Sequence, residues 1–451
     1  MAEAMTAKPD SPEAGDRSAP HDPKPAASND TALISQWLTG RRGLGGDSAA
    51  AGGRIWNRSF VSAFATYFLI NLGLNLSNVL VSPYAQDLGA TPIVIGVVAS
   101  AFTVVSILFK LFSAPAIDTF NRKFLLLGAV TVIAIAFSGY ALSTTPQSVM
   151  SFRIVQGAGQ AFTSTTCIAL AADTLPRRKL AAGLGIFALA TGAAQMIGAP
   201  LSLKIQEATS FQVTFLIAVG VMVLAAVAIL QIRTSHPIRP KKRFRITPRT
   251  VIAREALIPA ALQFCFLFAW STVNSFVVIF GLDRGVGSDV GYFFTVYGLC
   301  LFVASPLGGR MVDRFGYLAM IPMLACLVAC MYLISIADSL WMLLLAAAVG
   351  AFGYGAAGPV TRSMAMSVVP GDRRGAASST LYLGSDLGQL LGPIVGGVLA
   401  ASFGYAAMFR LAPLSIGLAL IVLLVFRGYL RRRTAEMIAL DDARVPGASP
   451  P

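Results

Sequence analysis

Long runs of apolar residues, separated by short polar stretches, dominate the chain from about residue 55 to residue 430. Each run is close to the roughly 20 apolar residues that an α-helix needs to cross a bilayer. The pattern therefore predicts an all-α membrane protein with twelve transmembrane helices. We expect these helices over residues 60–83, 91–117, 124–142, 147–171, 180–203, 211–232, 256–282, 290–307, 318–337, 340–366, 375–401 and 405–426.

A short polar turn follows both the second and the eighth apolar run. The second copy, residues 309–316, reads Gly-Arg-Met-Val-Asp-Arg-Phe-Gly, and residues 114–123 form a weaker copy. A repeat of this kind in an apolar chain indicates two similar halves. The longest internal polar run, the basic linker at 233–254, separates them. The chain is thus predicted to form two pseudo-symmetric six-helix bundles, at 55–232 and 255–430.

Lysine and arginine residues gather in every second linker, after the second, fourth, sixth, eighth and tenth runs. Positively charged loops stay in the cytoplasm, so we expect these linkers and both termini to be cytoplasmic. Residues 1–54 are rich in Ala, Pro, Asp, Ser and Gly and lack an apolar run. They are predicted to be a disordered cytoplasmic tail without a signal peptide. Residues 431–451 are predicted to form a second cytoplasmic tail.

The composition agrees with a bilayer environment and excludes several classes of protein. Hydrophobic residues make up 55% of the chain and charged residues 12%, against about 25% charged residues in soluble domains. The net charge of +14 lies mainly between the apolar runs, so we expect no nucleic-acid partner. The five cysteines lack neighbouring histidines, which predicts no metal and no cofactor. Without catalytic clusters or an ATPase motif, the chain is not expected to be an enzyme or an ATP-driven pump.

Three motifs resemble those of the major facilitator superfamily of secondary transporters. Residues 309–316 match the family's loop motif Gly-x-x-x-Asp-Arg-x-Gly, and residues 153–159 match its Arg-x-x-Gln-Gly-x-Gly motif. Residues 388–397 carry the Gly-x-x-x-Gly-Pro-x-x-Gly-Gly pattern, which family antiporters have in the fifth helix and this chain has in the eleventh run. The resemblance covers about residues 55–430. It implies two bundles that rock about a central cavity to give alternating access.

The repeated turn is predicted to act as a gate at the cytoplasmic side. Asp118 and Asp313 fall at C-terminal helix ends, where a carboxylate opposes the helix dipole and needs a cation or another helix's N-terminus. Such contacts would close this side and break when it opens; alternatively, they only anchor helix ends. The predicted gating residues are Asp118, Arg122, Lys123, Gly309, Asp313, Arg314 and Gly316.

Two charged residues inside the apolar runs are predicted to couple transport to protons. Asp386 is the only Asp or Glu deep in a run, and a glycine stripe on the same helix leaves its face for the cavity. Arg153 has no charged counterpart, because Ala348 stands at the equivalent position. A hydroxyl partner for Asp386 and backbone carbonyls for Arg153 are the structural alternatives. Lys110 is expected to snorkel or to pair with Asp118.

Polar stripes on four helices are predicted to bind the substrate, because the family resemblance places these helices around the cavity. The residues are Asn71, Asn75, Asn78, Gln156, Gln160, Gln263, Trp270, Asn274 and Tyr354. Amide, aromatic and apolar groups with little charge suit a neutral or weakly charged amphipathic solute. Each residue alone could instead form an interhelical hydrogen bond.

The sequence therefore predicts a monomeric secondary active transporter of the inner membrane. We expect it to export a small amphipathic solute or drug in exchange for protons, as the drug/proton antiporter branch does. The alternative is a facilitator or importer of a neutral metabolite, such as a sugar or nucleoside, without obligatory proton exchange. The absence of a carboxylate from the first run and the incomplete motif in the fifth favour this alternative.

Overall fold

The computed structural model describes residues 58–175, 180–232, 252–370 and 373–443. For some residues within these ranges, Asp118 and Asp313 among them, it describes the backbone alone. The predicted N-terminal tail and most of the basic linker at 233–254 lie outside the described residues. Nothing in the structure therefore bears on those two predictions.

Every regular element in the described residues is helical, and helices cover each apolar run that the sequence predicts. The first group is α2 (Arg58–Asp87), α3 (Pro92–Thr119), α4 (Arg122–Leu142), α5 (Pro146–Thr174), α6 (Leu180–Ala208) and α7 (Phe211–Gln231). The second group is η2 (Arg254–Ala256), α9 (Leu257–Asp283), η3 (Gly287–Gly291), α10 (Tyr292–Phe315), η4 (Gly316–Ala319), α11 (Met320–Ile336), α12 (Leu340–Gly350), η5 (Ala351–Gly355), α13 (Ala356–Ser367), α14 (Arg374–Phe403), α15 (Tyr405–Leu411) and α16 (Leu414–Ala443).

Ten helical stretches in the described residues are long and apolar enough to cross a membrane. Helix α5 is of similar length but is not among them, because Arg153, Gln156 and Gln160 reduce its hydropathy. Helix α6 is also outside this set. The chain is therefore a helical, multi-pass membrane protein, and membrane crossings by α5 and α6 stay a prediction.

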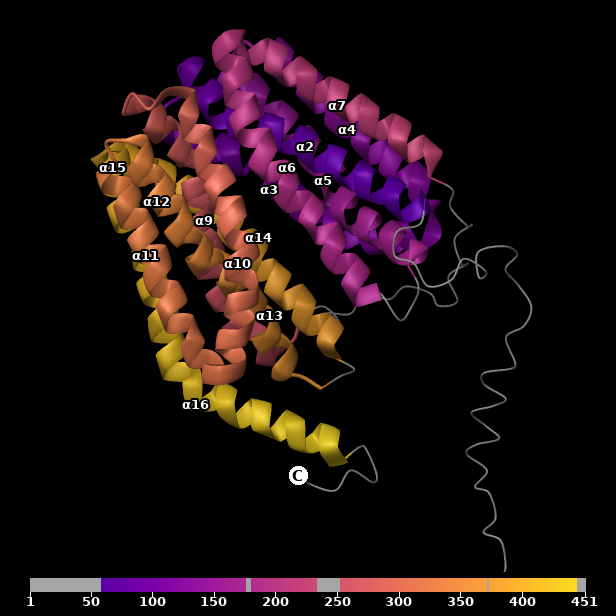
Figure 1. Ribbon diagram of the computed structural model, residues 1–451, viewed down its shortest axis with the longest axis vertical. Helices are drawn as coiled ribbons and strands as arrows, with labels where there is room; N and C mark the ends of the chain where they lie inside the picture. Colours follow the sequence, from indigo (N-terminus) through magenta and orange to yellow (C-terminus); the bar gives the residue numbers. More distant parts are fainter. Residues whose placement is uncertain (1–57, 176–179, 233–251, 371–372, 444–451) are drawn as a thin grey trace, which may run out of the picture. The chain divides into compact units, whose positions relative to one another are not determined.

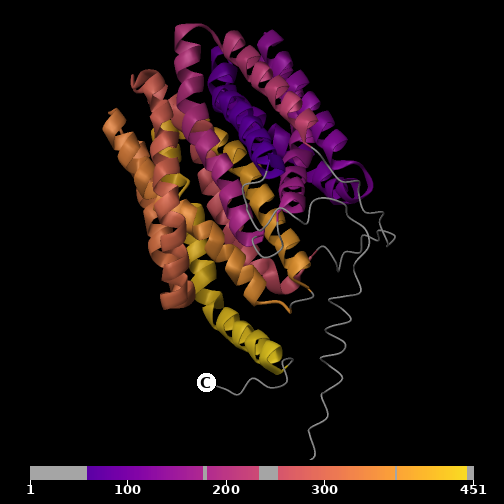
Figure 2. The same ribbon diagram turned by 45° about the vertical axis from the view of Figure 1, so that its right-hand side comes forward.

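Helices α2–α7 pack mainly on one another, and so do the helices from α9 to α16. Figures 1 and 2 show the first group in indigo to pink and the second in salmon to yellow. The main contacts between the groups join α3 to α14 and α6 to α10. Helix α9 is the most enclosed span, with 78% of its apolar window buried, against 28% for the span that contains α16.

Close contacts between the two groups lie toward one end of the helices. We name it the α2–α3 end, because α2 ends and α3 begins there; α3 ends and α4 begins at the opposite α3–α4 end. A Cβ atom on Gly96 would lie 2.1 Å from the carbonyl oxygen of Pro393, so α3 and α14 touch through their backbones. The Thr295 hydroxyl donates to the Met196 carbonyl at 2.7 Å and joins α10 to α6.

Glycines also allow α14 to pack closely on α9, as the glycine stripe in the sequence predicts. Cβ atoms on Gly384, Gly388 and Gly392 would lie 2.3, 2.5 and 2.3 Å from carbonyl oxygens of α9. Small residues allow helices in a bilayer to approach this closely. This packing determines which face of α14 turns away from α9, and with it the position of Asp386.

Helix α16 is longer than the sequence predicts, because residues 431–443, assigned above to a tail, continue the helix. Its 30 residues exceed the roughly 20 that a spanning helix needs. In both ribbon views its last part (yellow) bends away from the direction of the first. Leu430, directly before this extension, and Met437 within it are buried, so the arginine-rich segment packs on the rest of the protein.

Candidate functional site

A cavity of about 260 Å³ lies where the two groups of helices meet. Five amides from four helices contribute to its wall: Asn75, Asn78, Gln195, Asn274 and Gln389. Hydroxyl groups and two phenylalanines, Phe102 and Phe294, complete most of the remaining surface. Among the lining residues only Arg153 is charged, and three predicted substrate-binding residues, Asn75, Asn78 and Asn274, line the cavity with it.

The guanidinium of Arg153 is held by neutral groups on α2, α3 and α5. Nη1 donates to Asn78 Oδ1 at 2.6 Å and to Gln156 Oε1 at 2.8 Å. Nη2 makes a long contact of 3.4 Å with the Ala99 carbonyl, and the guanidinium carbon lies 4.7 Å from the centre of the Phe102 ring. Amide oxygens and a π face therefore solvate this charge.

Gln156 connects Arg153 to a wider network. Its Oε1 also accepts a hydrogen bond of 2.6 Å from the Tyr140 hydroxyl, and its Nε2 donates to Asn78 at 3.0 Å and to Gln160 at 3.3 Å. The spacing of Arg153, Gln156 and Gln160 places all three on one face of α5. The role of Tyr140 was not predicted from the sequence, because nothing in the pattern of α4 indicates which helix its buried hydroxyl faces.

Burial of the charged Arg153 side chain carries a free-energy cost. Only 4% of the residue is exposed, and it forms no ion pair with any residue that the structure describes. An arginine in the middle of a membrane helix costs about 3 kcal/mol on insertion scales. The hydrogen bonds from amide oxygens offset part of this cost without removing the charge.

Asp386 does not line the cavity, contrary to the expectation from its helical face. Its Oδ1 lies 2.8 Å from Nζ of Lys110, so the pair joins α14 to α3. The Asp386 side chain is 12% exposed and the Lys110 side chain 38% exposed. Helix α3 packs against α14 and supplies a cation to Asp386, so a role of this carboxylate in proton coupling stays a prediction.

The remaining predicted substrate residues lie outside the cavity wall. Asn71 donates to the Tyr67 carbonyl of its own helix at 2.8 Å, and Gln263 accepts a hydrogen bond from Thr361. Trp270 stacks between two tyrosines, with ring centres 4.4 Å from Tyr297 and 4.9 Å from Tyr354. Gln263 therefore matches the alternative of an interhelical hydrogen bond, and the Trp270 stack is part of the buried core.

The predicted gating residues occupy the α3–α4 end. Lys123 Nζ donates to the Leu230 carbonyl at 2.5 Å and to the Ile232 carbonyl at 3.2 Å, which satisfies the end of α7. Gly316 has φ +58°, a left-handed conformation that favours glycine, as α10 gives way to η4.

For the other predicted gating residues, the structure describes few contacts or only the backbone. Arg314 is exposed, with its guanidinium 5.4 Å from the Phe315 ring centre, and a Cβ on Gly309 would meet open space. Arg122 begins α4. The side chains of Asp118 and Asp313 lie outside the described residues, so the latch contacts stay a prediction.

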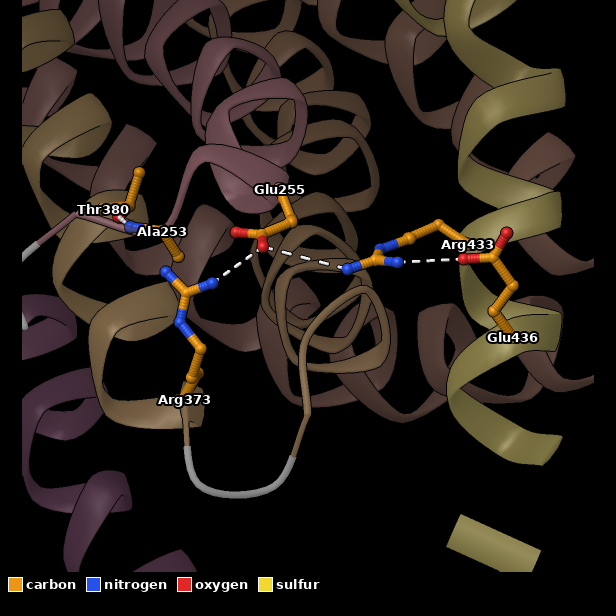
Figure 3. Close-up of polar contacts among 6 residues, drawn as sticks. All are labelled: Ala253, Glu255, Arg373, Thr380, Arg433 and Glu436. Carbon is orange, nitrogen blue, oxygen red and sulfur yellow. Dashed lines mark hydrogen bonds and ion pairs between the residues drawn. The ribbon is translucent and has the colours of Figure 1, made fainter. Parts of the chain in front are cut away.

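A charged cluster at the same end was not found from the sequence (Figure 3). Glu255 Oε1 lies 2.7 Å from Nη1 of Arg373 and 3.8 Å from Nη2 of Arg433. Arg433 also pairs with Glu436 at 2.9 Å. The cluster ties the start of α9 to the start of α14 and to the extension of α16. Its members come from a linker and from a segment assigned to a tail, so no local pattern marks them as partners.

The α2–α3 end is closed by polar contacts between the groups. Lys204 Nζ lies 2.7 Å from Asp289 Oδ1, and the Ser288 hydroxyl donates to Glu207. The hydrogen bond that Lys204 donates to Asp289 raises the pKa of Lys204 above its ordinary value, and desolvation acts in the opposite direction. The pair is largely exposed, so solvent screens it.

A helical membrane protein with a polar cavity between two groups of helices has the form of a carrier. The chain belongs to the Major Facilitator Superfamily, whose family model matches residues 63–287 and 259–442. Proteins of this family are transporters and not enzymes, in agreement with the expectation from the sequence.

Similar proteins are transporters with different names and solutes. An uncharacterized MFS-type transporter of Methanocaldococcus jannaschii, MJ1560, is 21% identical over 368 residues, which cover 79% of this chain and 95% of that protein. Multidrug resistance protein MdtG of Enterobacter lignolyticus is 32% identical over 172 residues, which cover 36% of this chain and 41% of that protein. The second match therefore spans about two-fifths of its relative.

Solved transporter structures share the fold. The nucleoside transporter NupG gives a TM-score of 0.69 at 14% identity, with 82% of this chain and 99% of that chain covered. A POT family transporter in complex with a thioalcohol-conjugated peptide also gives a TM-score of 0.69, at 15% identity, with 83% and 96% covered. At these identities the likeness concerns the fold alone.

Proposed function

We propose that the protein exports a small amphipathic solute from the cell in exchange for protons. The observation that carries this proposal is the cavity, whose wall combines amides, hydroxyls, two phenylalanines and one arginine from both groups of helices. A cavity of about 260 Å³ is slightly smaller than the roughly 300–1,000 Å³ of typical ligand pockets, which suits a small solute. The partial match to MdtG, a multidrug resistance protein, supports efflux.

The proposed topology has twelve transmembrane helices in two pseudo-symmetric bundles, at 55–232 and 255–430. In this arrangement α5 and α6 also cross the membrane, although the polar residues of α5 make that helix less apolar. The α3–α4 end faces the cytoplasm, because basic residues gather in the linkers of that end. Both termini are then cytoplasmic, and the protein acts as a monomer in the inner membrane.

Proton coupling is assigned to the Lys110–Asp386 pair, which bridges the two groups of helices. While Asp386 is ionised, its attraction to Lys110 holds α3 against α14. Protonation of the carboxylate removes that attraction and allows the helices to separate. Because both residues lie beside the cavity without lining it, a proton on Asp386 can change the conformation without touching the solute.

Gating is assigned to the two ends of the helices. At the α2–α3 end, Lys204 and Asp289 join the groups in the described conformation, which therefore favours access from the α3–α4 end. The repeated turns with Asp118 and Asp313 are proposed to form the opposite latch when that end closes. Asp313→Asn should then reduce transport while expression stays normal.

A second candidate is a facilitator or importer of a neutral metabolite such as a nucleoside or a sugar. The amides in the cavity favour it, because they can donate to and accept from hydroxyl and base groups. Likeness to the nucleoside transporter NupG is compatible with this candidate but concerns only the fold. It differs from the first in requiring no proton gradient.

Flux into proteoliposomes, with and without an imposed pH gradient, separates the two candidates. We expect the wild-type protein to accelerate solute movement in the direction set by the gradient, and Asp386→Asn to show flux that ignores it. Lys110→Gln, which removes the ion pair and keeps the carboxylate, distinguishes loss of the proton carrier from loss of the ion pair. Asp338→Asn is the matched control, since Asp338 is exposed in the turn between α11 and α12. Flux in the wild type that is insensitive to the gradient would rule out the exchange mechanism.

A further inference from the structure

The geometry points to an anion-binding subsite at Arg153, so that the transported solute carries one oxyanion group such as a carboxylate or phosphonate. This inference rests on the proposed function, because it concerns the solute of the same cavity. It narrows a neutral or weakly charged amphipath to an organic acid.

The charges around the cavity do not balance. Arg153 is the one charged side chain in the described wall, and no carboxylate lines it. Asp386, a buried acid one helical turn from the lining residue Gln389, is paired with Lys110 at 2.8 Å. Among the described residues, Asp386 is offset by Lys110, and Arg153 is the positive charge in the cavity wall. A bound monoanion would neutralise it.

The donors of Arg153 are also incompletely used. Nη1 makes two short hydrogen bonds, to Asn78 and Gln156. Among the residues that the structure describes, Nη2 has the long 3.4 Å contact to Ala99, and Nε is buried without a hydrogen-bond partner. Nε and Nη2 form one edge of the guanidinium, and a carboxylate can accept from both atoms of such an edge. An oxyanion that replaces the long contact to Ala99 would therefore complete the hydrogen bonding.

The hydrogen-bond network holds the opposite edge of the guanidinium in place. Tyr140 and Gln156 determine the position of Nη1, and Phe102 covers one face of the group. A guanidinium fixed in this way loses little conformational freedom on binding, which favours selective recognition of planar or tetrahedral oxyanions.

The other walls specify the rest of the solute. Phe102, Phe294 and Pro393 supply apolar surface, and Ser271, Asn274 and Ser275 of α9 supply neutral polar groups. No group in the described wall would bind a cation by charge. The structure thus favours a small aromatic or aliphatic acid over a cationic drug of equal size.

Three probes with one carbon skeleton test the charge preference: 4-phenylbutyrate, 4-phenylbutyramide and 4-phenylbutylamine. Their binding to the purified full-length protein in detergent is measured by titration calorimetry at neutral pH. We expect the carboxylate to bind at least about tenfold more tightly than the amide, because charge-assisted hydrogen bonds are the stronger kind. Arg153→Gln should reduce the ratio of carboxylate to amide affinity to about one. Arg153→Lys should retain part of this preference, since lysine keeps the charge but lacks the paired N–H donors of the guanidinium.

Arg284→Gln is the matched control, because Arg284 is exposed and lies over the Phe280 ring outside the cavity. It should keep the wild-type ratio. Size-exclusion chromatography and thermal unfolding establish that each variant is folded. Equal binding of carboxylate and amide by the wild type, tighter binding of the amine, no binding of the carboxylate, or a ratio that survives Arg153→Gln would each overturn the subsite.

These measurements use no membrane and no gradient, so they are independent of the transport test. Selective binding of the carboxylate without gradient-driven flux would preserve the subsite and remove proton exchange. Gradient-driven flux without a charge preference at Arg153 would preserve proton exchange and remove the subsite.

Discussion

Helices α5 and α14 each carry a buried charged residue, together with glycines that lie against the backbone of a neighbouring helix. On α14, Asp386 has a cation from α3 within 2.8 Å. On α5, Arg153 has amide oxygens, a carbonyl and an aromatic ring, and no acid among the described residues. One charge is thus neutralised by an ion pair within the protein, and the other is the one that we propose to bind an oxyanion of the solute. Similar helix packing therefore serves two different electrostatic arrangements.

Glycines in contact with a neighbouring backbone are the feature that the two helices share, and substitutions there have the largest expected effect. Cβ atoms on Gly392 and Gly157 would each lie 2.3 Å from a backbone oxygen, of Phe268 and Phe102 respectively. Gly392→Leu and Gly157→Leu should each reduce the free energy of unfolding by about 3 kcal/mol, because a backbone cannot move aside. Thermal unfolding in detergent measures this. Gly417→Leu is the control, since its Cβ would meet open space, and equal melting of all three variants would contradict the prediction.

The charges are the feature in which the helices differ, and their removal should affect stability unequally. Asp386→Leu leaves Lys110 without this partner and should cost about 1–2 kcal/mol, a value reduced because Lys110 is partly exposed. Lys110→Met/Asp386→Leu should recover most of that loss. Arg153→Met should change stability by less than about 1 kcal/mol.

The reason for the small effect at Arg153 is that its acceptors keep other donors. Asn78 still accepts from Gln156, and Gln156 still accepts from Tyr140. Thermal unfolding of the wild type and of these three variants, all under one condition, measures the difference. A larger loss for Arg153→Met than for Asp386→Leu would show that Arg153 acts mainly as a structural residue.

Tyr140→Phe tests how firmly the network positions Arg153. The change removes one hydrogen bond of 2.6 Å to Gln156 and should cost about 1 kcal/mol of stability. Gln156 then has more freedom, and binding of 4-phenylbutyrate should weaken by about threefold, since 1.4 kcal/mol corresponds to a tenfold change. Calorimetry measures both affinities. An unchanged affinity would mean that Arg153 is held without Tyr140.

The smallest effect is expected at the α2–α3 end, where Lys204 and Asp289 are exposed. The hydrogen bond to Asp289 raises the pKa of Lys204. A raised lysine pKa means that its contribution is complete below the ordinary value, about 10.4, and disappears only as pH rises through the higher value. Lys204→Met should therefore cause a small drop in melting temperature that is constant from pH 6 to pH 9. A drop that shrinks between pH 7 and pH 9 would contradict the raised pKa.

Several features of the site could be read from residue spacing. Arg153, Gln156 and Gln160 share a face of α5 because they are three and seven residues apart, and they do form one network. The glycine stripe on α14 predicts close packing, which the contacts with α9 confirm. Asn75, Asn78 and Asn274 line the cavity as their helical faces predict. Periodicity is enough for such features, since they depend on one helix at a time.

Contacts between residues on different helices could not be predicted from residue spacing. Trp270 was expected at the cavity, but its face meets Tyr297 and Tyr354. The Glu255–Arg373–Arg433 cluster joins three segments that are far apart in the chain. A helical pattern indicates which face is polar and leaves open which neighbour will meet it.

The sequence by itself determined that the chain is a helical membrane protein of this family, because apolar runs, loop charges and motifs are local properties. It also identified the two charged residues on α5 and α14 that distinguish the halves. Only the tertiary structure decided that Lys110 neutralises Asp386 while Arg153 keeps its charge at the cavity. The physical reason is that an ion pair depends on the distance between helices from different halves, and that distance follows from packing rather than from either helix alone.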